Sequence, residues 1–404
     1  MSHDLPRGFL VLPAPEDRTL ARLTRKLRLL VLQRLLTTRA RTAPLSGALP
    51  RVQGWLQGLA RDKGRAELLL EALGDPAVMV PLLCLESGQL DAGEAIARAV
   101  PSLLARLGRE VPQRVSREQL LWDVPLERLD VGEHQLRFAP AALGMLVDGA
   151  EVSVRTADGV DHALAERVGS EDAVEALFPL FEGGPALSLC DANPLAMVED
   201  HPDKAGNATD LGGRSVEDWC GALREAFDLI AVALPELHRE LTTHLRRLVP
   251  VGFEPERHLS ASYMEAPSQI YLSLHPSALT LAEALIHEGQ HGKLNTLRWF
   301  DAVLDNGDET WTESPVRPDL RPLMGVLMGV HAFVPVAALH QRLEALEHPI
   351  VATPHFARRR REVLGVNRDG LRTLHALGKP TRAGARVMAA LDELHLATGG
   401  EPPG

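Results

Sequence analysis

The sequence contains few cysteines and few aromatic residues. Its three cysteines, Cys84, Cys190 and Cys220, are widely separated among the 404 residues and form no C-x-x-C pair. This spacing indicates neither a disulfide framework nor a zinc ribbon, and it is typical of a protein of the reducing cytoplasm. Phe, Trp and Tyr together make up only 4% of the residues, whereas Leu, Ala and Arg are plentiful, which favours helices.

The sequence also lacks an excess of positive charge, a secretion signal and a long apolar run. Its 43 Lys and Arg residues against 54 Asp and Glu residues give a net charge of −11, which argues against non-specific nucleic-acid binding as the main activity. The N-terminus is not typical of a signal peptide, and no apolar run reaches the roughly 18 residues of a membrane span. We therefore predict a cytoplasmic protein that binds neither nucleic acid nor membrane, and the oligomeric state stays open.

The most informative feature that is present is an H-E-x-x-H motif, His287-Glu288-Gly289-Gln290-His291. Residues four apart share one face of an α-helix, so His287 and His291 can bind one metal ion while Glu288 lies beside it. The upstream segment Thr280-Leu281-Ala282-Glu283 is typical of a capping box and predicts a helix that begins about two turns before His287. Gly289 between the histidines would allow another element or a substrate to approach closely.

Two strand-like runs, Ala261–Met264 and Gln269–Leu274, precede the motif helix. We expect them to pair as a hairpin beside that helix. A sheet edge can bind an extended peptide as an added strand, so we predict that Ser262 and Tyr263 bind substrate.

Apolar periodicity predicts the organisation of the whole chain. Strand-like runs and Asp-Gly turns occupy residues 134–166, while four-residue periodicity before them predicts helices over 18–40, 51–73, 75–86 and 92–108. We expect the four arginines Arg358–Arg361 to lie on a solvated helix face. The predicted class is α+β and mostly α-helical, a helical bundle with a small antiparallel β-element packed beside the metal helix. The predicted parts are an N-terminal helical region (1–130), a small β-element with its connection (131–182), a metal-site catalytic domain (183–398) and a disordered tail (399–404).

Two histidines do not complete a catalytic metal site, which commonly has three protein ligands. His331 lies in a strongly apolar segment 40 residues after His291, where an uncommitted imidazole needs a partner. It is therefore our first candidate for the third ligand. Acidic residues of the downstream segments are the other candidates: Glu313, Glu309 and Asp319.

Two chemistries fit this motif. In a zinc hydrolase, Glu288 would be the general base that deprotonates a metal-bound water. In a non-haem iron oxygenase, two histidines and a third ligand hold the ion and leave positions for a co-substrate and oxygen. Arg317 and Arg321 lie in a proline-rich turn, and an arginine can bind the distal carboxylate of 2-oxoglutarate bidentately. A peptidase has no obligatory need for this pair.

The chain resembles bacterial HExxH-motif peptide-modification proteins, which accompany ribosomally made and post-translationally modified peptides. The resemblance covers about residues 185–345, and two positions depart from the pattern: Val316 stands where Trp is expected, and His331 where Tyr is common. The segments that carry it are His287-Glu288-Gly289-Gln290-His291, Ser314-Pro315-Val316-Arg317-Pro318-Asp319-Leu320-Arg321-Pro322-Leu323, Gly329-Val330-His331-Ala332-Phe333, Asp191-Ala192-Asn193-Pro194 and His201-Pro202.

The resemblance implies an iron(II) and 2-oxoglutarate-dependent oxygenase that hydroxylates the β-carbon of a residue in a precursor peptide. With this activity, His287 and His291 would be the metal ligands and Glu288 would orient the bound groups. His331 stays our candidate for the third ligand from its apolar segment, although the Tyr that is common at its position in the family argues against it. Arg317 or Arg321 would bind 2-oxoglutarate. Two alternatives stay open: a zinc metallopeptidase with Glu288 as general base, and a non-catalytic partner that binds the precursor peptide for another enzyme.

Overall fold

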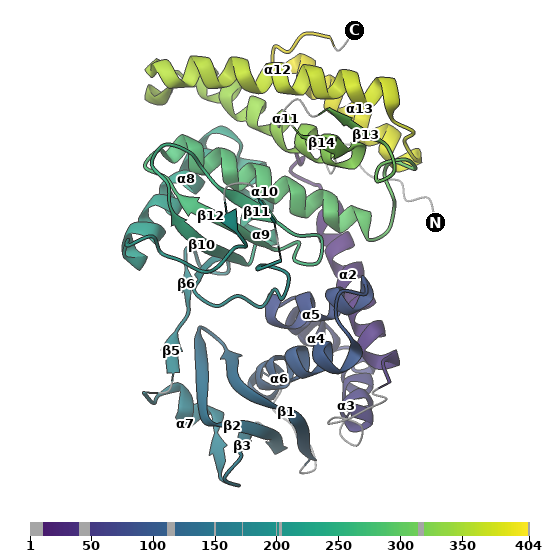
Figure 1. Cartoon of the computed structure of the whole chain (residues 1–404), viewed down its shortest axis with the longest axis vertical. Coiled ribbons are helices and arrows are strands. Elements are labelled where there is room, and N and C mark those ends of the chain that lie inside the picture. The colour runs from purple at the N-terminus through teal and green to yellow at the C-terminus, as the bar shows by residue number, and fades with distance from the viewer. Residues whose placement is uncertain are drawn as a thin grey trace. The chain divides into compact units, whose positions relative to one another are not determined.

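The computed structural model of the chain is mostly α-helical, with 54% helix and 18% strand, and its strands form small sheets (Figure 1). The predicted α+β class is therefore confirmed. The structure describes residues 11–39, 49–110, 118–148, 151–171, 173–198, 200–201, 204–313 and 319–402. The described chain divides into two compact units. The first, here the N-terminal unit, comprises residues 25–179 and 186–210; the second, here the metal unit, comprises residues 11–24, 180–185 and 211–402.

The predicted helical segments of the N-terminal unit are helical with one interruption, and the structure adds a short helix at the end of residues 134–166, where only strands and turns were predicted. The segment predicted as one helix over 51–73 is interrupted between Asp62 and Arg65, because the Asp62 carboxylate accepts a 2.9 Å hydrogen bond from the Gly64 amide in a local turn. The helices are α2 (Thr19–Thr37), whose first residues belong to the metal unit, α3 (Leu49–Arg61), α4 (Ala66–Ala72), α5 (Pro76–Glu86), α6 (Ala92–Glu110) and the short α7 (Leu164–Val168).

The predicted β-element is an antiparallel sheet of the same N-terminal unit. Its order is β1-β2-β3-β4, with β5 paired to β2. Because β1 already begins at Glu118, the predicted boundary at residue 130 falls inside a strand, and α6 packs against this sheet. The strands of this sheet are β1 (Glu118–Val131), β2 (His134–Asp148), β3 (Glu151–Thr156), β4 (Asp161–Ala163) and β5 (Ala173–Glu175). Outside this sheet lie the pair β6 (Leu177–Pro179) and β7 (Ala186–Ser188) and the pair β8 (Asp200–His201) and β9 (Lys204–Ala205).

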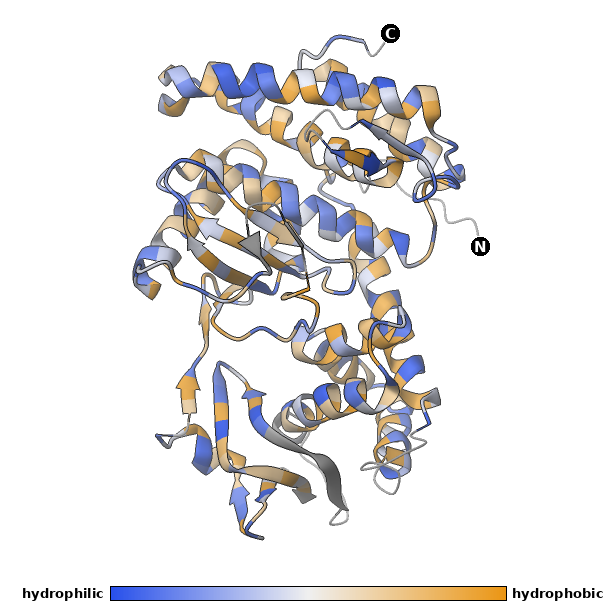
Figure 2. Cartoon of the chain, viewed as in Figure 1, coloured by the Kyte–Doolittle hydropathy of each residue, from blue (hydrophilic) through white to orange (hydrophobic). Residues whose placement is uncertain are grey.

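The metal unit is built around the apolar helix α11 (Leu323–Ala345), which packs against α10, α12 and α13. Figure 2 shows many hydrophilic residues on α12, which covers α11. In length and composition α11 could cross a membrane, but 78% of its most apolar window is buried, as in a core helix. The other helices are α8 (Val216–Ala233), α9 (Pro235–His244), α10 (Ala278–Arg298), η1 (Pro349–Ala352), α12 (Pro354–Leu377) and α13 (Arg382–Ala397).

The predicted hairpin beside the motif helix is present. Strand β11 (Ser260–Ser262) pairs antiparallel with β12 (Gln269–Leu274), and Ala261 lies opposite Tyr271. Both strands pack against α10, whereas β10 (Arg247–Phe253) pairs with β12 in parallel. A second hairpin is formed by β13 (Trp311–Glu313) and β14 (Leu320–Pro322).

The N-cap of the motif helix α10 lies three residues before the predicted capping box. This N-cap is Ser277, whose hydroxyl accepts a 3.3 Å hydrogen bond from the Thr280 amide. Thr280 and Glu283 therefore lie inside the helix, and Glu283 is buried rather than capping. The expected close approach at Gly289 is present, because a Cβ there would overlap the side chain of Leu241 on α9.

The C-terminal tail, predicted to be disordered, is described as far as Pro402. The Glu401 carboxylate forms a 2.9 Å ion pair with Arg368, and its backbone carbonyl lies 3.1 Å from the His395 ring. These contacts attach the described part of the tail to α12 and α13.

Candidate metal centre

His287 and His291 converge on one point of α10. Their Nε2 atoms are 2.9 Å apart, and the rings are nearly perpendicular, with centroids separated by 4.4 Å. Two nitrogens that bind one ion at about 2.1 Å and at about a right angle are also about 3 Å apart. The spacing of the two Nε2 atoms therefore fits neighbouring ligands of a single metal ion.

Both histidines are held in the neutral form that a metal requires. Burial lowers the pKa of His287 well below its usual value, and the neighbouring His291 and Arg359 lower it further. Burial likewise lowers the pKa of His291, against the opposing effect of Glu288. Neutral imidazoles leave their nitrogen lone pairs available at pH 7, so the donors are prepared for an ion without losing protons first.

Glu288 is fixed beside these histidines by two serines of β11. Its Oε1 accepts a hydrogen bond from the Ser260 hydroxyl and its Oε2 from the Ser262 hydroxyl, each at 2.6 Å. Donor atoms of His287, Glu288 and His291 all lie within 4.8 Å of one another. The structure thus brings together the three residues that the motif predicts.

Ser262 and Tyr263 make contacts different from the predicted one with a peptide. The Ser262 hydroxyl donates to Glu288, and Tyr263 packs edge-on against Tyr271 with ring centroids 5.4 Å apart. Ser260, which sequence reasoning missed, has the same role as Ser262. The signal was available, because residues two apart on a strand point to the same face.

The structure does not bring His331 to this group. On α11 the ring that contacts His287 is Phe333, with centroids 4.5 Å apart. Residues two apart on a helix point in nearly opposite directions, so His331 faces away from His287. It is buried in the core of the metal unit.

The acidic candidates for the third ligand do not join the group either. Glu309, Glu313 and Asp319 are exposed, and the Asp319 carboxylate is 3.4 Å from Arg321. Arg317 lies outside the described residues. Within the described chain, none of these joins the histidines and Glu288 as a third ligand.

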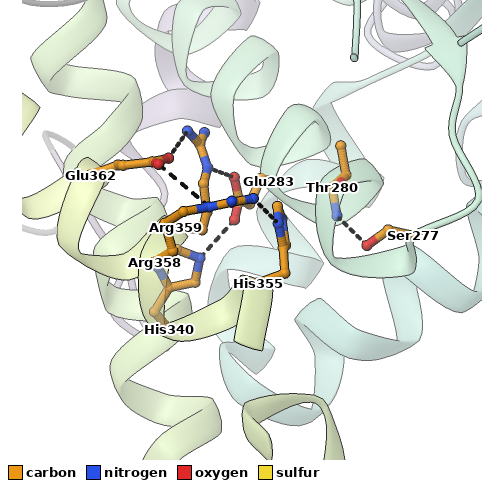
Figure 3. Close-up of polar contacts among 8 residues, drawn as sticks. All are labelled: Ser277, Thr280, Glu283, His340, His355, Arg358, Arg359 and Glu362. Carbon is orange, nitrogen blue, oxygen red and sulfur yellow. Dashed lines mark hydrogen bonds and ion pairs between the residues drawn. The ribbon is translucent and has the colours of Figure 1, made fainter. Parts of the chain in front are cut away.

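A buried network of charges lies one helical turn before His287 (Figure 3). Glu283 accepts hydrogen bonds from Arg359 Nε at Oε2 and pairs with His340 Nε2 at Oε1, both at 2.7 Å. Burial alone would raise the pKa of Glu283, but the His340 hydrogen bond and the charge of Arg359 outweigh it and hold the pKa below its usual value. Glu283 is therefore an ionised carboxylate inside the protein.

Arg359 corrects the expectation that all four arginines of Arg358–Arg361 are solvated. It is half-buried, and its guanidinium lies over the Phe333 ring, 5.6 Å from the centroid. Arg360 likewise pairs with Glu344 at 2.8 Å, whereas Arg358 and Arg361 are exposed as predicted. The sequence did contain a signal that Arg359 and Arg360 face the protein interior. The apolar residues Phe356 and Val363 are seven residues apart, buried, and on the same helix face as these two arginines.

No protein-family model matches this chain, and no curated protein shows significant similarity to it. Function is therefore inferred from the residues of the site. Two neutral imidazoles at ligand spacing, with a fixed carboxylate next to them, form a donor set that fits a divalent transition metal such as iron or zinc.

Proposed function

We propose that this chain is an iron(II) and 2-oxoglutarate-dependent oxygenase of the cytoplasm that hydroxylates the β-carbon of a residue in a ribosomally made precursor peptide. The observation that carries the proposal is the pair of His287 and His291 Nε2 atoms, 2.9 Å apart, beside the immobilised carboxylate of Glu288. The peptide substrate is supported by the resemblance of the motif segments to peptide-modification proteins.

In this function His287 and His291 hold the metal ion. When iron(II) is bound, it would supply the oxidising chemistry. 2-Oxoglutarate and O2 would give succinate and CO2, with one oxygen atom of O2 in succinate and the other inserted into a peptide C–H bond. Glu288 keeps a fixed orientation because each of its oxygens accepts a serine hydroxyl. A carboxylate held in one fixed position can orient the groups that bind at the metal ion.

Arg359 supports the co-substrate part of the proposal in place of Arg317 or Arg321. Its charge acts on His287, and Glu283 holds its Nε. The Arg359 Nη1 also forms a 3.8 Å ion pair with the exposed Glu362. A carboxylate ligand that displaces Glu362 would accept parallel N–H donors from the planar guanidinium. We propose that these donors bind the distal carboxylate of 2-oxoglutarate.

The edge strand β11 supports an extended peptide as substrate. It is the last strand in the order of its sheet within the described chain, and it packs against α10. An extended peptide can pair with the main chain of such an edge, while the serine side chains remain on Glu288.

The same edge strand also favours a second candidate, a zinc metallopeptidase. An extended peptide beside an H-E-x-x-H helix could present its scissile bond to a metal-bound water, with Glu288 as the general base. Each serine hydroxyl uses one lone pair of a Glu288 oxygen, and the second lone pair of each oxygen remains able to take the proton.

Binding of the co-substrate tests the proposal without a known peptide. Metal-free protein is loaded with iron(II) without oxygen, and 2-oxoglutarate is titrated while the visible spectrum is recorded. We expect a weak, saturable charge-transfer band that His287→Ala abolishes. Absence of the band together with tight zinc binding would favour the peptidase. With a peptide in hand, mass spectrometry separates the two functions, because hydroxylation adds one oxygen atom and hydrolysis gives two fragments.

Pyruvate is the matched probe for Arg359, because it chelates iron in the same way but has no distal carboxylate. We expect Arg359→Gln to weaken 2-oxoglutarate binding by about tenfold to a hundredfold and to leave pyruvate binding unchanged, since a charged hydrogen-bonded pair contributes about 1.5–3 kcal/mol. The exposed Arg358→Gln is the control. Equal affinities of the native protein for both acids would contradict the role of Arg359.

A further inference from the structure

His258 is a histidine near the metal centre to which the motif assigns no role. It lies two residues before β11, and a hydrogen bond to the main chain of Ser273 holds its ring. Its Nε2 is buried and has no hydrogen-bond partner within the described chain. The bond to Ser273 is therefore made through Nδ1, which leaves the Nε2 lone pair without a donor. A buried acceptor without a partner is costly unless something binds it.

The strand geometry directs His258 toward the metal helix. Leu259 continues the pairing of β11, because its amide donates to the Ser273 hydroxyl at 2.9 Å and its carbonyl accepts from the Ser273 amide at 2.8 Å. In an extended strand, alternate residues share one face. His258 therefore lies on the same face as Ser260 and Ser262, whose hydroxyls reach Glu288.

The electrostatics agree with this placement. Burial and the neighbouring His275 lower the pKa of His258 to about 4, while the charge of Glu288 opposes the shift. His258 in turn contributes to the lowered pKa of His287. The ring is thus neutral at pH 7, so Nε2 is an acceptor. The interactions with Glu288 and His287 place the ring near the metal centre, and it does not belong to the group of donor atoms that lie within 4.8 Å of one another.

We infer that His258 is a third imidazole of the site, whose Nε2 accepts a hydrogen bond from an N–H or O–H group of the molecule bound at the metal. The inference rests on the metal centre of the proposed function. It holds for a hydroxylase and for a peptidase, because both bind a peptide with N–H donors beside the ion. His258 positions this molecule, and the metal remains with His287 and His291.

The test compares two probes that bind metals, acetohydroxamate, which carries an N–H donor, and azide, which carries none. Cobalt(II)-loaded protein is titrated with each, and the visible spectrum reports binding. In His258→Ala we expect the Kd for acetohydroxamate to rise about tenfold, the size of one lost hydrogen bond, and the Kd for azide to stay within about twofold. His258→Gln keeps an acceptor and should restore most of the affinity. His331→Ala, a buried histidine that faces away from the site, is the control and should change neither.

Three results would overturn the inference. The first is a loss of cobalt affinity in His258→Ala as large as in His287→Ala, which would make His258 a ligand. The second is an equal change for both probes, and the third is no change for either. If the native protein binds no cobalt, the metal centre itself is refuted, together with everything that rests on it.

A measurement on the native protein covers the case in which the variants fail to fold. Long-range proton–nitrogen NMR spectra of the zinc-loaded protein report the state of each histidine nitrogen. We expect the His258 Nε2 to be unprotonated and its shift to change with acetohydroxamate but not with azide. A protonated or zinc-bound Nε2 would overturn the inference.

Discussion

Arg359 Nε donates a 2.7 Å hydrogen bond to Oε2 of Glu283, which lies one helical turn before His287. This bond joins α12 to the metal helix α10, and the same guanidinium lies over Phe333, which contacts His287. The support of the metal centre therefore comes from a residue far along the chain. Its consequences for stability and binding can be measured separately.

Removal of Arg359 should destabilise the protein more than removal of its neighbour. Arg359→Ala leaves the buried Glu283 carboxylate with His340 as its remaining charged partner. We expect the free energy of unfolding to fall by about 2 kcal/mol, less than for a fully buried ion pair, because Arg359 is partly exposed. The exposed Arg358→Ala should stay within about 0.5 kcal/mol. Urea unfolding followed by circular dichroism measures both. Equal losses for the two variants would show that the Arg359–Glu283 pair makes no specific contribution to the free energy of unfolding.

The two serines of β11 should be coupled to Glu288. Ser260→Ala or Ser262→Ala removes one donor from a buried carboxylate and should cost about 1–3 kcal/mol in the free energy of unfolding. In a Glu288→Gln background the same substitutions should cost less, because the charge that needs the donors is gone. A double-mutant cycle gives the coupling energy directly, and a value near zero would contradict the hydrogen bonds described.

A divalent metal should stabilise the folded protein through His287 and His291. At a free metal concentration 100 times the Kd, the free energy of unfolding should rise by about 2.7 kcal/mol, because the folded state alone offers both nitrogens at ligand spacing. Thermal unfolding with and without zinc or cobalt measures the effect. His287→Ala and His291→Ala should each abolish it, while His331→Ala should retain it.

Acid should destabilise the metal-free protein through the same histidines. Burial lowers the pKa of His287 and His291 in the folded state, so the unfolded chain binds more protons once the pH falls below its histidine pKa of about 6.5. Their contribution is fully present above about pH 6.5 and declines as the pH falls below it. Urea unfolding at several pH values should show this slope, and His287→Gln should flatten it. Stability that rises toward acid would contradict the assignment.

Two helix glycines should respond oppositely to alanine. A Cβ at Gly292 of α10 would overlap the Pro267 carbonyl, whereas a Cβ at Gly221 of α8 meets nothing within 4 Å. We expect Gly292→Ala to cost about 1–3 kcal/mol despite its better helix propensity. Gly221→Ala should stabilise by up to about 1 kcal/mol. Equal effects would mean that the loop carrying Pro267 does not pack tightly on the metal helix.

The helices and the close approach of His287 and His291 could be predicted from the sequence because they depend on residues close together in the chain. Helical periodicity fixed α10, and the four-residue spacing of His287 and His291 places both on one face of any helix they occupy. The strand pair before the motif was likewise visible as two alternating runs. The predicted cap, Thr280, lies three residues after the actual N-cap, Ser277, because several residues near a helix start can act as caps.

The tertiary structure alone decided which residues surround His287 and His291. His331 and Phe333 both lie in α11, and only the rotation of α11 against α10 selects Phe333 for contact with His287. Among four consecutive arginines, the packing of α12 selects Arg359 for Glu283, and the pairing of β11 with β12 carries Ser260 and Ser262 to Glu288. Local sequence determines which face a side chain occupies on its own element, whereas contacts between distant elements depend on how whole faces pack.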